Sequence, residues 1–179
     1  MSSPASSSLP PITLMGAGLV GSLLALYLAR RGYRVDVYER RPDIRKAGAA
    51  GGRSINLALS DRGWRALEGV GIGEEIRRVA IPMYRRVMHD PHGNLAHQPY
   101  GLTGQEAIYS VSRGGLNQTL LELADRHEAI SLHFEQQALD VDLPHRRLKM
   151  RDLPTGRDYE LQAQRIIGTD GAFSAIRTA

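Results

Sequence analysis

The stretch that most constrains the fold is GAGLVG at residues 16–21, directly after the apolar run 12–15. Such a run is typical of a strand buried on both faces of a parallel sheet. Helix-forming residues follow over 19–31 and end beside Gly32, and residues 34–38 alternate around two valines as a second strand. Strand, helix and strand within about 30 residues predict the right-handed crossover unit of a doubly wound α/β sheet.

The three glycines of this stretch have separate roles in a nucleotide-binding turn. Gly16 allows the tight turn, Gly18 allows the backbone to approach a pyrophosphate, and Gly21 allows the helix to pack closely on the sheet. The free amides and the positive helix end then face the anion. Glu39 follows 23 residues after Gly16, where a carboxylate binds a ribose diol and disfavours a 2'-phosphate. We therefore predict a dinucleotide site for NAD or FAD.

Two later features bear on the choice between these cofactors. In RIIGTDGAFSAIR, residues 165–177, an apolar strand leads into Asp170 and Gly171. Asp170 is expected to be free to bond sugar or ribityl hydroxyls, and Gly171 leaves room for a phosphate. Asp-Gly is equally an ordinary turn sequence. Arg113 begins a predicted amphipathic helix over 113–127, where a cation is unfavourable without an anion. Either Arg113 is solvated or it reaches a ligand phosphate or ring.

The rest of the chain predicts short elements and no internal repeat. A loop rich in glycine and alanine is expected over 42–52, and LPTG at 153–156 is a candidate hairpin turn. The expected short helices cover residues 61–69 and 73–80, and the expected strands cover 83–89, 94–99, 107–111, 131–134, 139–143, 147–151, 159–162 and 165–168.

Composition excludes several classes of protein. A chain of 179 residues has the length of one domain, and the absence of cysteine excludes a disulfide scaffold, a thiolate zinc site and a cysteine nucleophile. No apolar stretch approaches the roughly 18 residues of a membrane span. Residues 1–8 are small, polar and uncharged, which predicts a disordered leader rather than a targeting signal. The lack of cysteine fits a reducing compartment, so a cytoplasmic location is expected.

Three weaker signals carry no function. Between residues 30 and 46 seven basic residues face three acids, but without interleaved aromatics this predicts a solvated face and no nucleic-acid partner. His89, His92 and His97 lie in a predicted loop without cysteine or helical spacing, so no metal site is expected. Trp64, in a predicted helix, is expected in the core rather than against a cofactor.

Taken together, the glycine-rich turn, the arginine that heads a leucine-rich helix and the late Asp-Gly segment resemble the FAD-dependent aromatic hydroxylase family. A closer similarity lies with the members that hydroxylate L-kynurenine, and GRSINLALS is its most specific stretch. The similarity covers essentially the whole chain after residue 8. It is carried by YERRPDIRKAGAAGGRSINLALSDRG at 38–63, QPYG at 98–101 and SVSRGGLNQTLL at 110–121.

The resemblance implies two groups of site residues and no catalytic acid or base, because the flavin supplies the chemistry. Arg86 and Tyr100 match the positions that hold the kynurenine carboxylate, which a guanidinium and a phenol can satisfy together. Taken without the family, both are surface or turn residues, and Arg85 would point to the other face of a strand. The cofactor group is Gly16, Gly18, Gly21, Glu39 and Arg40 at the ADP half of FAD, Ala58 near the flavin, and Arg113 and Asp170.

The implied activity is hydroxylation of L-kynurenine to 3-hydroxykynurenine with bound FAD, NADPH as transient reductant, and O2. Family members are much longer, so residues 9–179 are expected to be an incomplete FAD-binding domain from the amino-terminal part of such an enzyme. Strands of a mixed substrate-domain sheet are expected to be inserted at about 81–111. Two alternatives stay open. An NAD-dependent dehydrogenase would explain the first 40 residues but not Arg113 or the Asp-Gly segment. A catalytically inactive nucleotide-binding fragment would have the same site residues as the hydroxylase, so the sequence does not separate these two. The oligomeric state is not determined.

Overall fold

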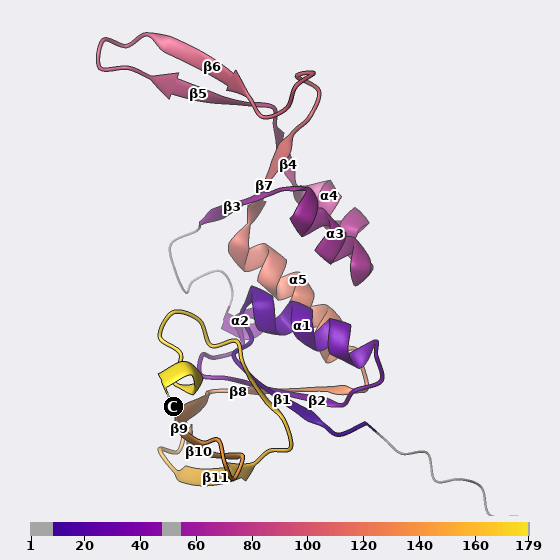
Figure 1. The fold of residues 1–179 in the computed structure, drawn as a ribbon, viewed down its shortest axis with the longest axis vertical. Coiled ribbons are helices and arrows are strands. Elements are labelled where there is room, and N and C mark those ends of the chain that lie inside the picture. The colour runs from indigo at the N-terminus through magenta and orange to yellow at the C-terminus, as the bar shows by residue number, and fades with distance from the viewer. Residues whose placement is uncertain (1–8, 48–54, 179) are drawn as a thin grey trace, which may run out of the picture. The chain divides into compact units, whose positions relative to one another are not determined.

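The computed structural model describes residues 9–47 and 55–178, which form two compact units (Figure 1). The first unit combines the chain before residue 53 with the chain from residue 117 onward, and the second comprises residues 53–116. The leader expected at 1–8 and the end of the loop expected at 42–52 lie outside the described residues.

The first unit is built on a four-stranded parallel sheet in the order β12-β1-β2-β8. Its strands are β1 (Ile12–Met15), β2 (Val35–Glu39), β8 (Ile130–Phe134) and β12 (Ile166–Gly168). Helix α1 (Leu19–Ala29) connects β1 to β2, so the predicted strand-helix-strand unit is confirmed. Every residue of β1 is buried, which explains why this strand reads as an apolar run without alternation.

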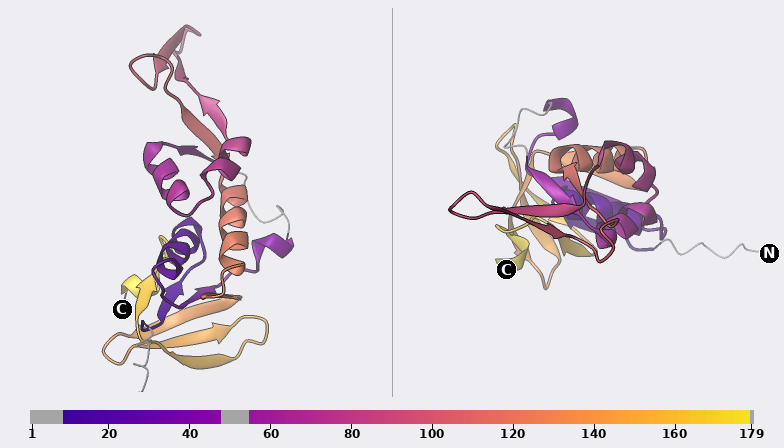
Figure 2. Two further views of the ribbon diagram at one scale, coloured as in Figure 1. Left: turned by 90° about the vertical axis from the view of Figure 1, so that its right-hand side faces the viewer. Right: turned by 90° about the horizontal axis from the view of Figure 1, so that it is seen from above.

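Different layers cover the two faces of this sheet (Figures 1 and 2). Helix α1 and the part of α5 (Arg113–Asp125) from Asn117 onward lie on one face. The antiparallel sheet of β9 (Gln136–Asp142), β10 (Arg147–Asp152) and β11 (Asp158–Gln162) lies on the other. The α/β class with a parallel sheet is confirmed, and its second face is covered by strands rather than helices. The core between the two sheets is formed by Met15, Val141, Leu148, Met150 and Ala163.

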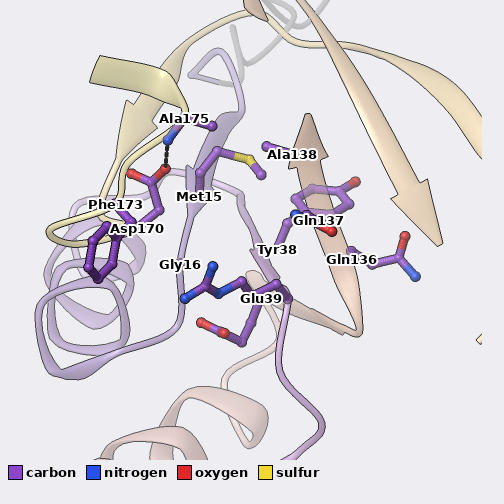
Figure 3. A pocket seen from close by; sticks show the side chains of 11 residues that line it. Met15, Gly16, Tyr38, Glu39, Gln136, Gln137, Ala138, Asp170, Phe173 and Ala175 are labelled. Carbon is purple, nitrogen blue, oxygen red and sulfur yellow. Dashed lines mark hydrogen bonds between the residues drawn. The ribbon is translucent and has the colours of Figure 1, made fainter. Parts of the chain in front are cut away.

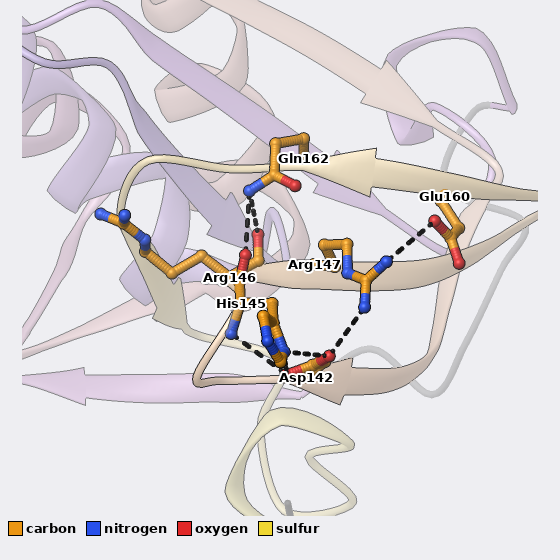
Figure 4. Close-up of polar contacts among 6 residues, drawn as sticks. All are labelled: Asp142, His145, Arg146, Arg147, Glu160 and Gln162. Atoms are coloured by element: carbon orange, nitrogen blue, oxygen red, sulfur yellow. Dashed lines mark hydrogen bonds and ion pairs between the residues drawn. The ribbon is translucent and has the colours of Figure 1, made fainter.

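A polar cluster holds the turn between β9 and β10 (Figure 4). The Asp142 carboxylate accepts a hydrogen bond from the His145 amide at 3.1 Å and lies 2.8 Å from Nδ1 of His145 and 3.1 Å from Nη2 of Arg147. These bonds, first of all the one from the His145 amide, hold the pKa of Asp142 below its ordinary value. The side-chain amide of Gln162 donates to the carbonyls of His145 and Arg146, so β11 also closes the turn.

The second unit has an antiparallel sheet in the order β3-β7-β4, two helices and a separate hairpin. Trp64 is buried, meets the Tyr109 ring edge-on at 5.1 Å and carries the Arg77 guanidinium 4.3 Å from its own ring. The core position predicted for Trp64 is therefore confirmed. The elements are β3 (Asn56–Leu59), α3 (Asp61–Gly69), α4 (Gly73–Val79), β4 (Ile81–Met83), β5 (Arg85–His89), β6 (Leu95–Pro99) and β7 (Ile108–Ser112).

The structure differs from the sequence prediction at three elements. The strand expected over 83–89 is divided into β4 and β5, and β3 was not predicted. The short helix α2 (Ile44–Ala47) lies inside the expected loop. It is held by buried Asp43, whose carboxylate accepts from the Arg45 amide at 3.0 Å, while the Arg45 side chain pairs with Asp43 and with Asp125 of α5. The contact with Asp125 spans 80 residues, so the local sequence does not reveal it.

Four strands occupy residues 81–112, where strands of a substrate domain were expected. The compact unit that contains them begins earlier, at residue 53, and includes α3 and α4. Their assignment to a substrate domain stays a prediction.

Leu148 tests the core between the two sheets of the first unit. Its side chain is fully buried in β10, whereas its neighbour Lys149 is exposed. We expect Leu148→Ala to lower the free energy of unfolding by about 2–5 kcal/mol, because it removes buried methyl groups and leaves a cavity. Lys149→Ala should stay within about 0.5 kcal/mol of the wild type in the same urea titration. Equal losses for the two variants would contradict this assignment of the core.

Candidate dinucleotide-binding site

The glycine-rich turn joins β1 to α1 and is packed tightly against the end of β12. Gly16 has a φ of 107°, and a Cβ built on it would lie 2.6 Å from the carbonyl oxygen of Thr169. A Cβ on Gly21 would overlap the carbonyl oxygen of Gly16 and lie 2.8 Å from the Thr169 hydroxyl. The tight turn at Gly16 and the close helix packing at Gly21 are as the sequence predicts.

Gly18 has the opposite surroundings. It is exposed, it immediately precedes α1, and a Cβ built on it would meet no heavy atom of the described chain within 4 Å. The amino end of α1 has no side-chain cap from Gly18 and no acidic residue in its first turn. Its first N–H groups and the positive end of the helix dipole are therefore available to an anion.

Glu39 connects the end of β2 to this turn. Its Oε2 accepts a hydrogen bond from the Ala17 amide at 2.8 Å, and its Oε1 accepts one from the Arg41 amide at 2.9 Å. A carboxylate oxygen can accept more than one hydrogen bond, so Glu39 can hold the turn and still accept from a ribose hydroxyl.

A cavity of about 120 Å³ opens beside the turn, at the carboxyl ends of β1, β2 and β12 (Figure 3). Ligands of open α/β sheets bind at this edge. The cavity brings together four of the predicted cofactor residues: Gly16, Glu39, Arg40 and Asp170. The remaining lining residues are Met15, Tyr38, Gln136, Gln137, Ala138, Phe173 and Ala175.

Tyr38 forms an aromatic wall of the cavity. Its ring stacks on that of His133 at a centroid distance of 4.5 Å, and Nε2 of His133 lies 3.3 Å from Oδ1 of Asp36. Burial, followed by the negative charge of Asp36, raises the pKa of Tyr38 to about 12. A phenol of ordinary pKa is already protonated at neutral pH, and the raised pKa extends to higher pH the range in which Tyr38 adds no negative charge to a site that contains two carboxylates.

The Asp170 carboxylate has partners within the chain that the sequence did not predict, and its role toward a ligand stays a prediction. Its Oδ1 accepts from the Ser174 hydroxyl at 2.6 Å, and its Oδ2 accepts from the Ala175 amide at 2.9 Å. The chain after Gly171 turns back and places these donors on the carboxylate, just before the 3-10 helix η2 (Ile176–Thr178). Asp170 thus orders the segment that forms one wall of the cavity.

The other predicted site residues lie in the second unit. Ala58 is exposed in β3 opposite Ser110. Arg113 is the first residue of α5, where its amide donates to the carbonyl of Ile55. The Arg113 side chain is exposed and has no ion pair with any residue that the structure describes, so both alternatives for it stay open.

Arg86 and Tyr100 belong to the β5–β6 hairpin. Arg86 pairs with Gln98 across the two strands, and the Tyr100 amide donates to the carbonyl of Tyr84. Directly opposed residues share a face and strand residues alternate, so Arg86 and Tyr100 share a face. Arg85 is on the other face. This common face is what the proposed substrate role of the pair requires, and the role itself stays a prediction.

Sequence reasoning missed the residues that hold the turn from behind. Ser22, Asn117 and Thr169 donate to its carbonyls, and residues 136–138 with Phe173 line the cavity. Ser22 and Thr169 stand next to the motif residues Gly21 and Asp170, and Asn117 lies within the stretch 110–121, but nothing in the local sequence shows that they contact the turn. In the described ranges, no three histidine, cysteine or acidic side chains gather into a candidate metal site. None of the described helices combines the length and apolar character needed to cross a bilayer.

Alanine substitutions at Gly21 and Gly18 compare a tightly packed position of this turn with an open one. Gly21→Ala should lower the free energy of unfolding by about 3 kcal/mol, because its Cβ has no room beside the Gly16 carbonyl. Gly18→Ala should cost no more than about 1 kcal/mol, since its Cβ meets nothing and only the poorer N-cap preference of alanine opposes it. Urea unfolding of both variants measures the difference. A stable Gly21→Ala variant would refute the close packing.

Comparisons with known proteins agree with this geometry. The chain is 46% identical over 168 residues to kynurenine 3-monooxygenase of Myxococcus xanthus, covering 94% of this chain and 36% of that protein. It is 48% identical over 166 residues to the enzyme of the same name from Flavobacterium johnsoniae, covering 93% of this chain and 36% of that protein. The Anopheles gambiae enzyme of that name is 44% identical over 166 residues. The chain thus spans about a third of the length of these relatives.

Solved structures show the same fold. The flavin-dependent monooxygenase PieE, in complex with FAD and substrate, has a TM-score of 0.80 at 21% identity, over 94% of this chain and 31% of that chain. The p-nitrophenol 4-monooxygenase of Pseudomonas putida has a TM-score of 0.79 at 21% identity, over 94% of this chain and 42% of that chain. The family described as FAD binding domain matches residues 11–179. With the turn, the cavity and the sheet edge all in place, the chain belongs to this FAD-binding domain family.

Proposed function

We propose that the chain binds FAD at the β1–α1 turn, and that the whole protein hydroxylates L-kynurenine to 3-hydroxykynurenine with NADPH and O2. One observation carries the cofactor part. The amino end of α1 is left without a side-chain cap beside an exposed Gly18, two residues after Gly16, which lines a cavity together with Glu39. The reaction is supported by the similarity to kynurenine 3-monooxygenases over almost the whole of this chain.

The described residues fit the ADP half of FAD. The uncapped helix end offers N–H donors and a positive dipole to the pyrophosphate. Glu39 offers carboxylate oxygens to a ribose diol, and the exposed guanidinium of Arg40 stands beside it. The half-buried Tyr38 ring, Met15 and Ala138 give the cavity a partly apolar lining for a flat ring. These groups bind and orient the cofactor and perform no proton transfer.

When bound, FAD supplies the chemistry of hydride acceptance and oxygen activation. The residues of this chain would then act on the substrate by position. Arg86 and Tyr100, on one face of the β5–β6 hairpin, offer a charged fork and a phenol to the kynurenine carboxylate. A cytoplasmic location belongs to the same proposal, because a chain without cysteine suits a reducing compartment.

Flavin retention tests the cofactor. The purified chain is mixed with FAD, passed through a desalting column and examined by visible absorption. We expect the wild type to keep the flavin bands in the presence of excess NAD, and Gly18→Ala to lose them while remaining folded, because its Cβ fills the approach to the helix end. A colourless wild type would contradict FAD binding. Displacement of the flavin by NAD would favour the dehydrogenase alternative.

The substrate role is tested on the whole protein with a matched arginine pair. Arg86→Leu should raise the KM for L-kynurenine by about 10- to 100-fold, because it removes a charge-assisted hydrogen bond to the carboxylate. Arg85→Leu, on the opposite face of β5, should leave that KM within about twofold. NADPH oxidation stimulated by L-kynurenine is the assay. The reverse ranking of the two variants would transfer the role to Arg85, and an unchanged KM in both variants would exclude the role for both.

A further inference from the structure

The backbone of the glycine-rich turn is held by side chains from four separate places in the fold. The Ala17 amide donates to Glu39, which follows 22 residues later. The Ala17 carbonyl accepts from the Ser22 hydroxyl at 3.0 Å and from Nδ2 of Asn117 at 3.2 Å. The Thr169 hydroxyl lies 2.9 Å from the carbonyl oxygen of Met15 and 2.8 Å from that of Gly16, and its single proton can be donated to either. The Met15 carbonyl also accepts from the Thr169 backbone amide at 2.7 Å, so the hydroxyl is the side-chain donor for Gly16. Every carbonyl from Met15 to Ala17 therefore has a protein donor.

This arrangement fixes which side of the turn faces a ligand. Carbonyl oxygens repel an anion, whereas amides attract it. Because the three carbonyls are bonded toward the protein interior, the amides at the start of α1 are left for the opposite, open side at Gly18. The donors thus set the orientation of the turn in the absence of any ligand.

Thr169 contributes shape as well as a hydrogen bond. Its hydroxyl would lie 2.8 Å from a Cβ on Gly21, and its carbonyl 2.6 Å from a Cβ on Gly16. The hydroxyl therefore sits between the turn and α1 with no space to spare. Valine is close to threonine in size but has a methyl group in place of the donor. A methyl group cannot approach carbonyl oxygens to 2.8–2.9 Å, so valine both removes the hydrogen bond and moves the turn carbonyls away from this position.

Asn117 contributes through a single contact. Its Nδ2 reaches the Ala17 carbonyl from α5, but its Oδ1 is buried and has no hydrogen-bond partner among the described residues. A buried acceptor without a partner is unfavourable, and an apolar side chain at this helix position would avoid it. The contact with Ala17 is the one described gain from having an amide here.

We propose that Asn117 and Thr169 are positioning residues for the pyrophosphate of FAD: they hold the carbonyls of the turn inward so that its amides are set for the phosphates before FAD arrives. The inference rests on the proposed FAD binding and adds two residues that do not touch the cofactor. A site that is ordered in advance binds more tightly because less ordering is needed on binding.

The test measures affinity and local order in the full chain. Asn117→Leu and Thr169→Val should each raise the Kd for FAD, and for ADP, by about tenfold in a titration followed by fluorescence, as expected for one lost hydrogen bond. Thr169→Ser keeps the hydroxyl and should restore binding to within about twofold of the wild type. Asn117→Asp keeps the shape but places an acceptor against the Ala17 carbonyl, so it should bind at least as weakly as Asn117→Leu. Gln118→Leu is the matched control, because Gln118 is exposed on the same helix and its side-chain amide donates to Glu122 rather than to the turn.

A second readout separates positioning from general stability. In the chain without FAD, Asn117→Leu and Thr169→Val should speed hydrogen exchange of the amides at 17–19 and leave the exchange of β10 unchanged. The inference is overturned if both variants bind FAD and ADP as the wild type does, or if weaker binding only accompanies a general loss of protection. A wild type that binds neither FAD nor ADP would overturn the proposed function and this inference with it. Normal wild-type binding with unaffected variants would overturn the inference alone.

Discussion

The first unit depends on one close contact, between the backbone of the β1–α1 turn and the backbone that follows β12. Gly16 approaches Thr169 and Asp170 so closely that no side chain fits between them, and Gly21 approaches the Gly16 carbonyl in the same way. This contact joins the two ends of the described chain at the centre of the sheet, where β1 lies between β12 and β2. The crevice at the carboxyl ends of these strands exists because the chain crosses from one side of β1 to the other there.

Around that contact, charged side chains that line the cavity also hold the backbone of the loops beside it. The carboxylates of Glu39 and Asp170 both accept backbone amides, so each holds a loop that lines the cavity. Burial and the charge of Asp36 raise the pKa of Tyr38, so its phenol stays neutral to higher pH than an ordinary tyrosine does. The amino end of α1 is the exception, because no side chain caps it. The carboxylates beside the turn are thus bonded to backbone amides while the positive end of α1 is left open, which is the electrostatic condition for holding a pyrophosphate.

The second unit follows a different rule. Its core is organised by Trp64, which packs against Tyr109 and beneath Arg77, and an ion pair of Arg77 with Glu68 at 2.6 Å holds that guanidinium in place. The β5–β6 hairpin is exposed along its whole length and contributes nothing to that core. The register of its two strands places Arg86 on the same face as Tyr100 and Arg85 on the opposite face. Two adjacent arginines of identical chemistry are therefore distinguished by strand geometry alone.

The sequence by itself determined the strand-helix-strand unit, the turn glycines and the position of Glu39, because these features are encoded by contacts within about 30 residues and by the steric needs of a tight turn. Only the tertiary structure decided that strands cover the second face of the sheet. It likewise decided that an ion pair of Asp43 with Arg45 holds α2, and that the Ser174 hydroxyl donates to the Asp170 carboxylate. It also decided the parts played by Asn117 and Thr169, which bond the turn from 100 and 153 residues away. Separations of that size have no periodicity or local propensity to reveal them. Such contacts form only when packing brings elements that are distant in the sequence together.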